Sequence, residues 1–231
     1  MSVALITGGS RGLGFALARE LAARGKRVVI DGRDPEALER AATALGDVVP
    51  IAGDVTDADH RRRLKEAVDG LGSLDLLVNN ASSLGPSPLP GLEAFPLDEL
   101  ERVYRVNVLA PLALTQSLLP GLRRTGGTIV NVTSDAALEP YEGWGGYGSS
   151  KAALDQISAV LGAEQRSIRV YAFDPGDMRT VMQQEAFPGE DISDRPDPET
   201  VVPMFMRVLD EAPPSGRYRA SDLVTPAGMA S

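Results

Sequence analysis

Thr7-Gly8-Gly9-Ser10-Arg11-Gly12-Leu13-Gly14 is the stretch that decides the fold. It follows an apolar run, Val3–Thr7, and opens a helical pattern over Leu13–Arg24. Such a turn lets backbone amides approach a pyrophosphate, while the N-terminus of the helix favours the negative charge. A glycine-rich turn is weak evidence by itself, but its place between the first strand and the first helix favours a dinucleotide site.

Strand-like and helix-like segments alternate along the rest of the chain. The apolar runs that predict strands are Val3–Thr7, Arg27–Asp31, Val48–Ala52, Leu74–Asn79, Thr128–Val132, Ile168–Phe173 and Gly216–Ala220. The periodic segments that predict helices are Leu13–Arg24, Pro35–Leu45, Ala58–Leu71, Leu97–Leu122, Gly146–Ala163 and Pro198–Leu209. Alternation of this kind implies parallel strands joined by crossover helices. We therefore expect a single α/β domain over residues 1–231, built on a doubly wound parallel sheet of about seven strands with helices on both faces.

Composition and charge exclude several classes of function. The chain has 231 residues, no cysteine and a net charge of −9, which argues against disulfides, thiol chemistry and nucleic-acid binding. No apolar run approaches the roughly 18 residues of a membrane span, and residues 1–7 lack the basic flank of a signal peptide. We therefore expect a cytoplasmic protein that does not bind membranes.

The single histidine limits the possible chemistry further. His60 lies beside Arg61-Arg62-Arg63, in a charged segment that we expect to form a solvated helix face. A histidine-dependent triad and a histidine-ligated metal site are therefore not expected. Acid–base chemistry would fall to tyrosine, lysine or carboxylates.

Tyr147 and Lys151 are the first candidates for that chemistry. Residues four apart lie on one face of a helix, and a phenol normally loses its proton near pH 10. We expect Lys151 to lower the pKa of Tyr147, because a neighbouring ammonium favours the phenolate and makes the hydroxyl a more useful acid near neutrality. The alternative is a chance pair on an amphipathic helix, so the pair alone does not establish a function.

Polar residues also follow the predicted strands. Asp54-Val55 follows the third strand, Asn80-Ala81-Ser82 the fourth, Ser134 the fifth and Pro175-Gly176 the sixth. The carboxyl ends of parallel strands face a cofactor crevice, although ordinary Asx turns would explain the first two sites equally well. Asn107 interrupts an otherwise apolar helix face, which indicates either a surface position or a buried hydrogen-bonding role.

Together these motifs resemble the short-chain dehydrogenase/reductase family over about residues 2–220. The glycine turn resembles the family's cofactor-binding motif, Asn80-Ala81 its Asn-Asn-Ala-Gly segment, and Pro175-Gly176 with Thr180 its Pro-Gly motif. Its catalytic tetrad is matched by Asn107, Ser134, Tyr147 and Lys151. One departure is Ser82, which stands where the family usually has glycine and would affect a turn more than the chemistry.

The resemblance implies a Rossmann-type fold and an NAD(P)-dependent oxidoreductase that interconverts a carbonyl and a secondary alcohol without a metal. Tyr147 would donate or accept the proton, and Ser134 would hydrogen-bond the reacting oxygen. Lys151 would hold the nicotinamide ribose, and Asn107 would anchor a water in the proton path. The residues expected to bind the dinucleotide are Gly8, Ser10, Arg11, Gly12, Leu13, Gly14, Arg33, Asp54, Val55, Asn80, Ala81, Ser82, Tyr147, Lys151, Pro175, Gly176 and Thr180. A catalytically silent cofactor-binding sensor or scaffold, or a non-redox enzyme on the same fold, remains an alternative.

The second predicted strand offers two interpretations of the cofactor. Asp31, 17 residues after Gly14, could hold a ribose 2′-hydroxyl and favour NAD(H). Alignment with the family instead places Gly32 at the discriminating position, followed by Arg33, while Arg11 lies in the glycine turn. We expect NADP(H) to be preferred, with NAD(H) possible, because arginine pairs well with a 2′-phosphate.

Loops that flank the tetrad supply candidate walls for a small-molecule carbonyl or alcohol substrate. These are Leu84, Leu138, Tyr141, Trp144, Met178, Met182 and Phe187, each of which could equally be core packing. Residues 177–198 combine proline, glycine and acidic residues and are expected to form a lid, and residues 221–231 a tail.

An apolar excess on the two helices that hold Asn107 and Tyr147 predicts a homodimer through those helices. The residues that make up this excess are Leu109, Leu112, Leu114, Leu118, Ala152, Leu154, Ile157 and Val160.

Overall fold

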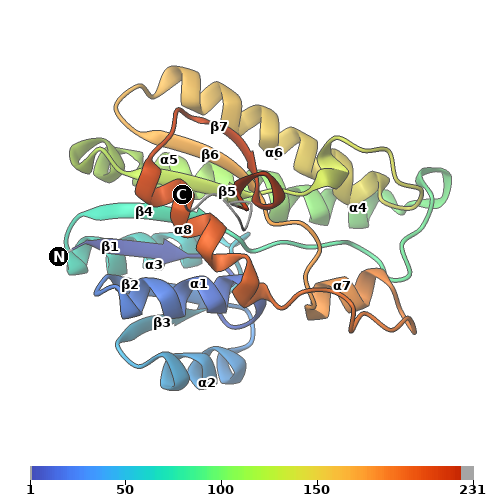
Figure 1. The fold of residues 1–231 in the computed structure, drawn as a ribbon, viewed down its shortest axis with the longest axis horizontal. Coiled ribbons are helices and arrows are strands. Elements are labelled where there is room, and N and C mark those ends of the chain that lie inside the picture. The colour runs from blue at the N-terminus through green and yellow to red at the C-terminus, as the bar shows by residue number, and fades with distance from the viewer. Residues whose placement is uncertain (1, 225–231) are drawn as a thin grey trace, which may run out of the picture.

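A computed structural model describes residues 2–224 of the protein. It shows a parallel sheet with helices on both faces (Figure 1). The strands are β1 Val3–Ile6, β2 Arg27–Gly32, β3 Val48–Ala52, β4 Leu74–Asn79, β5 Thr128–Val132, β6 Arg169–Asp174 and β7 Gly216–Arg219. Their order in the sheet is β3-β2-β1-β4-β5-β6-β7, and every neighbouring pair is parallel. The predicted doubly wound fold is confirmed.

The helices follow the predicted pattern with two exceptions. They are α1 Gly12–Ala23, α2 Pro35–Leu45, α3 Ala58–Leu71, α4 Leu97–Tyr104, α5 Ala110–Thr125, α6 Gly145–Glu164, α7 Val181–Ala186 and α8 Val202–Glu211. The prediction of one helix over Leu97–Leu122 is wrong, because a π-helical turn, Arg105–Leu109, separates α4 from α5. The second exception is α7, which lies in the segment 177–198 that is expected to form a lid and for which no helix was predicted. Within residues 2–224, no helix is both long and apolar enough to cross a membrane.

Strand residues alternate between two apolar cores, one on each face of the sheet. Ala4 and Ile6 of β1 pack with the core under α1, α2 and α8, whereas Val3 and Leu5 pack with the core under α3 and α5. Successive side chains of a strand point to opposite faces, so a strand covered on both sides must be apolar throughout. This explains why β1 is fully buried along its length.

The parallel register brings the carboxyl ends of the central strands to one edge of the sheet. Ile6 of β1 pairs with Ile30 of β2 and with Val78 of β4. Asn79, the last residue of β4, pairs with Asn131 of β5. The loops that leave these strands therefore begin side by side, which is where a doubly wound sheet binds its ligand.

Candidate active site

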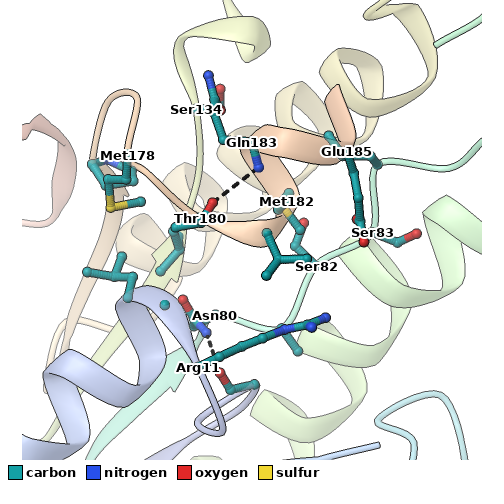
Figure 2. A pocket seen from close by; sticks show the side chains of 18 of the residues that line it. Arg11, Asn80, Ser82, Ser83, Ser134, Met178, Thr180, Met182, Gln183 and Glu185 are labelled. Carbon is teal, nitrogen blue, oxygen red and sulfur yellow. Dashed lines mark hydrogen bonds between the residues drawn. The ribbon is translucent and has the colours of Figure 1, made fainter. Parts of the chain in front are cut away.

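A cleft of about 1420 Å³ lies at this edge of the sheet. Of the residues predicted to form the site, all line the cleft except Gly14 and Asn107. Figure 2 shows Thr180, Met182 and Glu185 on one side of the pocket and Arg11 and Asn80 on the other. Segments far apart in the sequence thus meet around one cavity.

The glycine turn forms the cradle that a pyrophosphate needs. Gly8 has φ of 67°, and a Cβ on Gly14 would lie 2.3 Å from the Gly8 carbonyl oxygen, so side chains are excluded at both positions. Helix α1 begins directly after Arg11, and no side chain caps its N-terminus. The first amides of a helix have no partner within the helix and favour an anion. The turn therefore fits the phosphates of a dinucleotide.

Asn80 holds the cradle in place. Its Nδ2 donates to the carbonyl oxygens of Thr7 at 2.9 Å and Gly8 at 3.1 Å, and its backbone N–H donates to Thr7 Oγ1 at 3.0 Å. Ala81 N–H also donates to Thr7 Oγ1, at 3.0 Å. The segment after β4 therefore supports the turn after β1.

Asn107 lies in the π-helical turn and is fully buried. Its Nδ2 donates to the Ser83 carbonyl at 2.8 Å and to Ser150 Oγ at 2.9 Å. Its Oδ1 accepts from Ser83 N–H at 2.8 Å and Ser82 Oγ at 3.2 Å. An amide side chain has two donors and two acceptor positions, and all are used. The side chain therefore ties the β4 loop to α6, and the water that Asn107 was expected to anchor stays a prediction.

Tyr147 and Lys151 both lie on α6 and are buried at the cleft, with relative exposures of 8% and 2%. Lys151 Nζ donates to the Val132 carbonyl at 2.7 Å and lies 5.5 Å from the centre of the Tyr147 ring. Ser134 Oγ donates to Asp135 Oδ1 at 3.0 Å and accepts from Ala136 N–H at 3.2 Å. The structure thus brings Ser134, Tyr147 and Lys151 into one wall of the cleft.

Burial has the largest influence on the pKa of Tyr147 in this structure, and it acts against the lowering expected from Lys151. Burial raises the pKa of Tyr147, although hydrogen bonding with the Ser134 and Ser82 hydroxyls opposes the rise. Burial also lowers the pKa of Lys151, to about 8. Both shifts have one physical cause, since burial disfavours the charged form of each group. The phenol therefore stays protonated at neutral pH. The hydroxyl of Ser82 interacts with the Tyr147 phenol, although its position in a turn suggested a structural role only.

A family model described as short chain dehydrogenase matches residues 2–191. The chain belongs to this family.

Individual relatives agree with this assignment and identify the protein as an NAD(P)-dependent oxidoreductase. Sepiapterin reductase of Mus musculus is 36% identical over 203 residues, which cover 80% of this chain and 77% of the relative. Serine 3-dehydrogenase of Agrobacterium fabrum is 38% identical over 177 residues, which cover 74% and 70%. An alcohol dehydrogenase from the archaeon Thermococcus sibiricus, solved in complex with 5-hydroxy-NADP, superposes with a TM-score of 0.85 at 27% identity, covering 95% of each chain.

The alternative interpretation of the second strand depends on Asp31. Asp31 is only 1% exposed. Its Oδ1 accepts from Gly8 N–H at 2.7 Å, and its Oδ2 lies 3.0 Å from His60 Nε2. Both carboxylate oxygens therefore have protein partners, so Asp31 supports the glycine turn and is not presented to a ribose.

His60 corrects the expectation of a solvated helix face. It is completely buried under the sheet, and Arg63 Nη2 lies 3.2 Å from its Nδ1. Arg61 Nη1 donates to the Val55 carbonyl at 2.7 Å. Arg62 is exposed and forms ion pairs with Asp59 and Glu66, as expected of a solvated helix face. The sequence could have indicated this burial, because His60 lies one helical turn before Leu64 on the buried stripe of α3.

Arg217 of β7 is a second supporting residue of the short-chain dehydrogenase site that the motifs do not mark. Its Nη2 donates to the Ser134 carbonyl at 3.0 Å and to Asp174 Oδ2 at 2.9 Å, and its Nε donates to Asp155 Oδ2 at 3.0 Å. Asp174 Oδ1 accepts from Gly176 N–H at 3.0 Å. One guanidinium thus connects the Ser134 loop with the Pro-Gly turn.

Most of the predicted substrate-pocket residues line the cleft. They are Leu84, Tyr141, Trp144, Met178, Met182 and Phe187. Leu138 is the exception, because it is 63% exposed and lies outside the cleft. Thr180 caps α7 by accepting from Gln183 N–H at 3.1 Å (Figure 2). The segment after the Pro-Gly turn thus carries a short, capped helix along the cleft.

Proposed function

We propose that the protein interconverts a carbonyl compound and a secondary alcohol with NADP(H), and that Tyr147 is the acid–base group. The observation that carries this proposal is the convergence of Tyr147, Ser134 and Lys151 on a cleft whose other end is the glycine cradle. The test is consumption of NADPH by the purified protein with a panel of aldehydes and ketones.

Each residue of the proposed site has a role that its surroundings support. The Tyr147 phenol, protonated at neutral pH because burial raises its pKa, would give its proton to the substrate oxygen in the reducing direction. The Ser134 hydroxyl would hydrogen-bond the same oxygen as charge develops on it. Lys151, held by the Val132 carbonyl, would bind the nicotinamide ribose. Asn107 would act by positioning, since it fixes the loop that carries Ser82 and Ser83.

The cradle residues would hold the dinucleotide through backbone amides, and its nicotinamide would supply or accept the hydride. The chain's own contribution would be to bind this group, orient it and exclude water from the reacting carbon. The segment 177–198, which carries α7, would serve as the lid over the cleft.

We expect the wild-type protein to favour NADPH over NADH by at least about 10-fold in kcat/KM. Arg11 and Arg33 are exposed and line the cleft, and one charged hydrogen bond of ~1.5–3 kcal/mol to a 2′-phosphate exceeds a tenfold preference. We expect the Asp31 carboxylate to repel the 2′-phosphate little, because it is buried and its oxygens interact with Gly8 N–H and His60. Arg33→Ala should reduce or reverse the preference.

The matched control for that substitution is Arg40→Ala. Arg40 lies on α2, pairs with Glu36 and does not line the cleft, so its loss should leave the cofactor ratio unchanged. A wild-type preference for NADH would contradict the proposal and show that the ribose is read by another group.

The same observations give less support to two other functions. A silent sensor would need the cradle but not a buried phenol and ammonium 5.5 Å apart, as measured from Lys151 Nζ to the Tyr147 ring centre. A non-redox enzyme on this fold would bind the dinucleotide without net consumption of NADPH. The carbonyl panel separates both from a reductase.

We also propose a homodimer through α5 and α6. Leu114, Leu118 and Leu154 belong to the core, so the apolar excess on these helices is smaller than the sequence suggests. Leu109 and Val160 nevertheless remain 56% and 43% exposed. Contact with a second copy would remove this apolar surface from water, which is favourable.

Light scattering at micromolar concentration should give about twice the chain mass of 24.4 kDa. Leu109→Glu should shift the mass toward the monomer, because a carboxylate would be buried without a partner at the interface. Leu138→Glu is the control, since Leu138 is at least as exposed, at 63%, but lies outside the π-helical turn, α5 and α6. A wild-type mass near that of one chain would refute the dimer.

A further inference from the structure

The half of the cleft next to Tyr147 has an aromatic wall. The Trp144 ring centre lies 5.7 Å from that of Tyr147 and 5.9 Å from that of Phe187. Leu84 and Met182 belong to the same apolar cluster. Trp144 and Phe187 are only partly buried, so their surfaces are available to a planar or bulky apolar group beside the proposed acid.

The charged residues that line this half are mostly acids, namely Asp135, Glu142, Asp177 and Glu185. Asp135 is occupied, because its oxygens accept from Ser134 Oγ and Tyr141 Oη, each at 3.0 Å. Among residues 2–224, no cation forms an ion pair with Glu142 or Glu185. Figure 2 shows the Glu185 side chain pointing from α7 into the pocket on the side of Ser83.

The cations of this half are committed to other partners. Lys151 is 2% exposed and donates to the Val132 carbonyl. Arg179 forms a two-pronged pair with Asp197, at 2.6 and 2.7 Å. Arg11 and Arg33 lie at the glycine turn and after β2, where they would face the phosphates of the cofactor. A bound dinucleotide adds further negative charge to the cleft, so a substrate anion would meet repulsion without a compensating cation.

We propose that the site takes uncharged or cationic carbonyl compounds with a planar or bulky apolar body, and that Glu142 and Glu185 exclude carboxylates. This rests on the proposed function, since it concerns the substrate of the same cleft. An amine on the substrate would be favoured by the two free carboxylates and by the face of Trp144. Oxo acids and carbonyl compounds on anionic carriers would be poor substrates.

Three aryl ketones with one skeleton test the proposal: 4-acetylbenzoate, its methyl ester, and 4-(aminomethyl)acetophenone. Trp144 is the only tryptophan of the chain, so its fluorescence reports binding at this wall directly. Each ketone is titrated into protein saturated with NADP⁺, where no reduction takes place. The ester and the amine should bind at least about 10-fold more tightly than the acid, which corresponds to ~1.4 kcal/mol.

The discrimination should shrink in Glu142→Gln/Glu185→Gln and persist in Glu39→Gln/Glu164→Gln. The control removes the same formal charge from exposed positions on α2 and at the end of α6. The inference is overturned if the acid binds as tightly as the ester, if the double variant keeps the full discrimination, or if none of the ketones changes the Trp144 fluorescence. Absence of NADPH turnover would count against the proposed function instead, because the binding ratios do not depend on turnover.

Discussion

Tyr147→Phe should lower kcat for carbonyl reduction by about 10²- to 10⁴-fold, the usual contribution of general acid–base catalysis. The substitution removes only the phenolic hydroxyl, and the ring keeps its edge contact with Trp144. Burial raises the pKa of this phenol, so the wild-type group carries the required proton throughout the neutral range.

Among the described residues of the cleft, we expect no replacement for the lost acid. The other phenol there, Tyr141, donates to Asp135 Oδ2 at 3.0 Å. His60 is buried against Asp31 and Arg63 and does not line the cleft. Lys151 has its pKa lowered to about 8 by burial, but its Nζ is directed to the Val132 carbonyl. Ser134 carries an aliphatic hydroxyl, which is a far weaker acid than a phenol.

The measurement is NADPH oxidation with the best ketone of the panel, together with NADP⁺ binding followed by thermal shift. Binding should be nearly unchanged in Tyr147→Phe, because the cradle lies at the other end of the cleft. Tyr218→Phe is the control, since Tyr218 lies on β7 outside the cleft and its phenol donates to the Pro214 carbonyl. Near wild-type turnover in Tyr147→Phe would exclude the phenol as the acid.

Apolar runs predicted the central strands well because these strands are covered on both faces. Val28, Val29 and Ile30 are all completely buried, so their apolar run has only one structural explanation. Edge strand β7 carries Arg217, Tyr218 and Arg219 and is only half-buried. It was predicted nonetheless, because a strand is expected after helix α8 in the alternating pattern.

The π-helical turn could not be predicted in the same way. Arg105–Leu109 has the composition of the surrounding helix, and its extra residue per turn leaves no sequence pattern. The turn carries Asn107, whose side chain donates to Ser83 and Ser150. These partners lie 24 and 43 residues away in the sequence, so the residue was predicted but its role was not.

The role of Asp31 was also set by a distant residue. From the sequence, this carboxylate could equally face a ribose or the interior, because it lies at the end of a strand. The structure decides through His60, 29 residues later on α3, whose burial could be anticipated only from its place on the apolar stripe with Leu64 and Val68. Motifs therefore found the residues around the cleft, whereas the pair that supports the cradle required the assembled fold.

His60→Leu should destabilise the protein by about 3–5 kcal/mol at pH 8, the usual cost of leaving a buried charge, here the Asp31 carboxylate, without its partner. The substitution leaves the Asp31 carboxylate with Gly8 N–H as its remaining partner. For a chain of this size, the loss corresponds to a fall in Tm of roughly 6–20 °C. Circular dichroism during thermal unfolding measures it directly.

The destabilisation should depend on pH in a direction that follows from Asp31. Burial raises the pKa of Asp31, and the hydrogen bond to His60 opposes that rise. A carboxyl with a raised folded-state pKa contributes stability while it is protonated, and this contribution is lost as the pH rises through that value. Removing His60 raises the folded-state pKa of Asp31 further, so the deficit of His60→Leu should be larger at pH 8 than at pH 5.

A second variant separates the lost pair from the lost packing. Gly53 approaches His60 so closely that a Cβ there would lie 2.2 Å from Nδ1, so the shape of the imidazole matters as well as its charge. Asp31→Asn/His60→Leu removes the buried charge but keeps the same packing defect, and it should recover most of the stability lost at pH 8. If His60→Leu lost the same stability at pH 5 and pH 8, and the double variant recovered none of it, the imidazole would act through packing alone. The Asp31–His60 pair would then have no electrostatic part in holding the glycine turn.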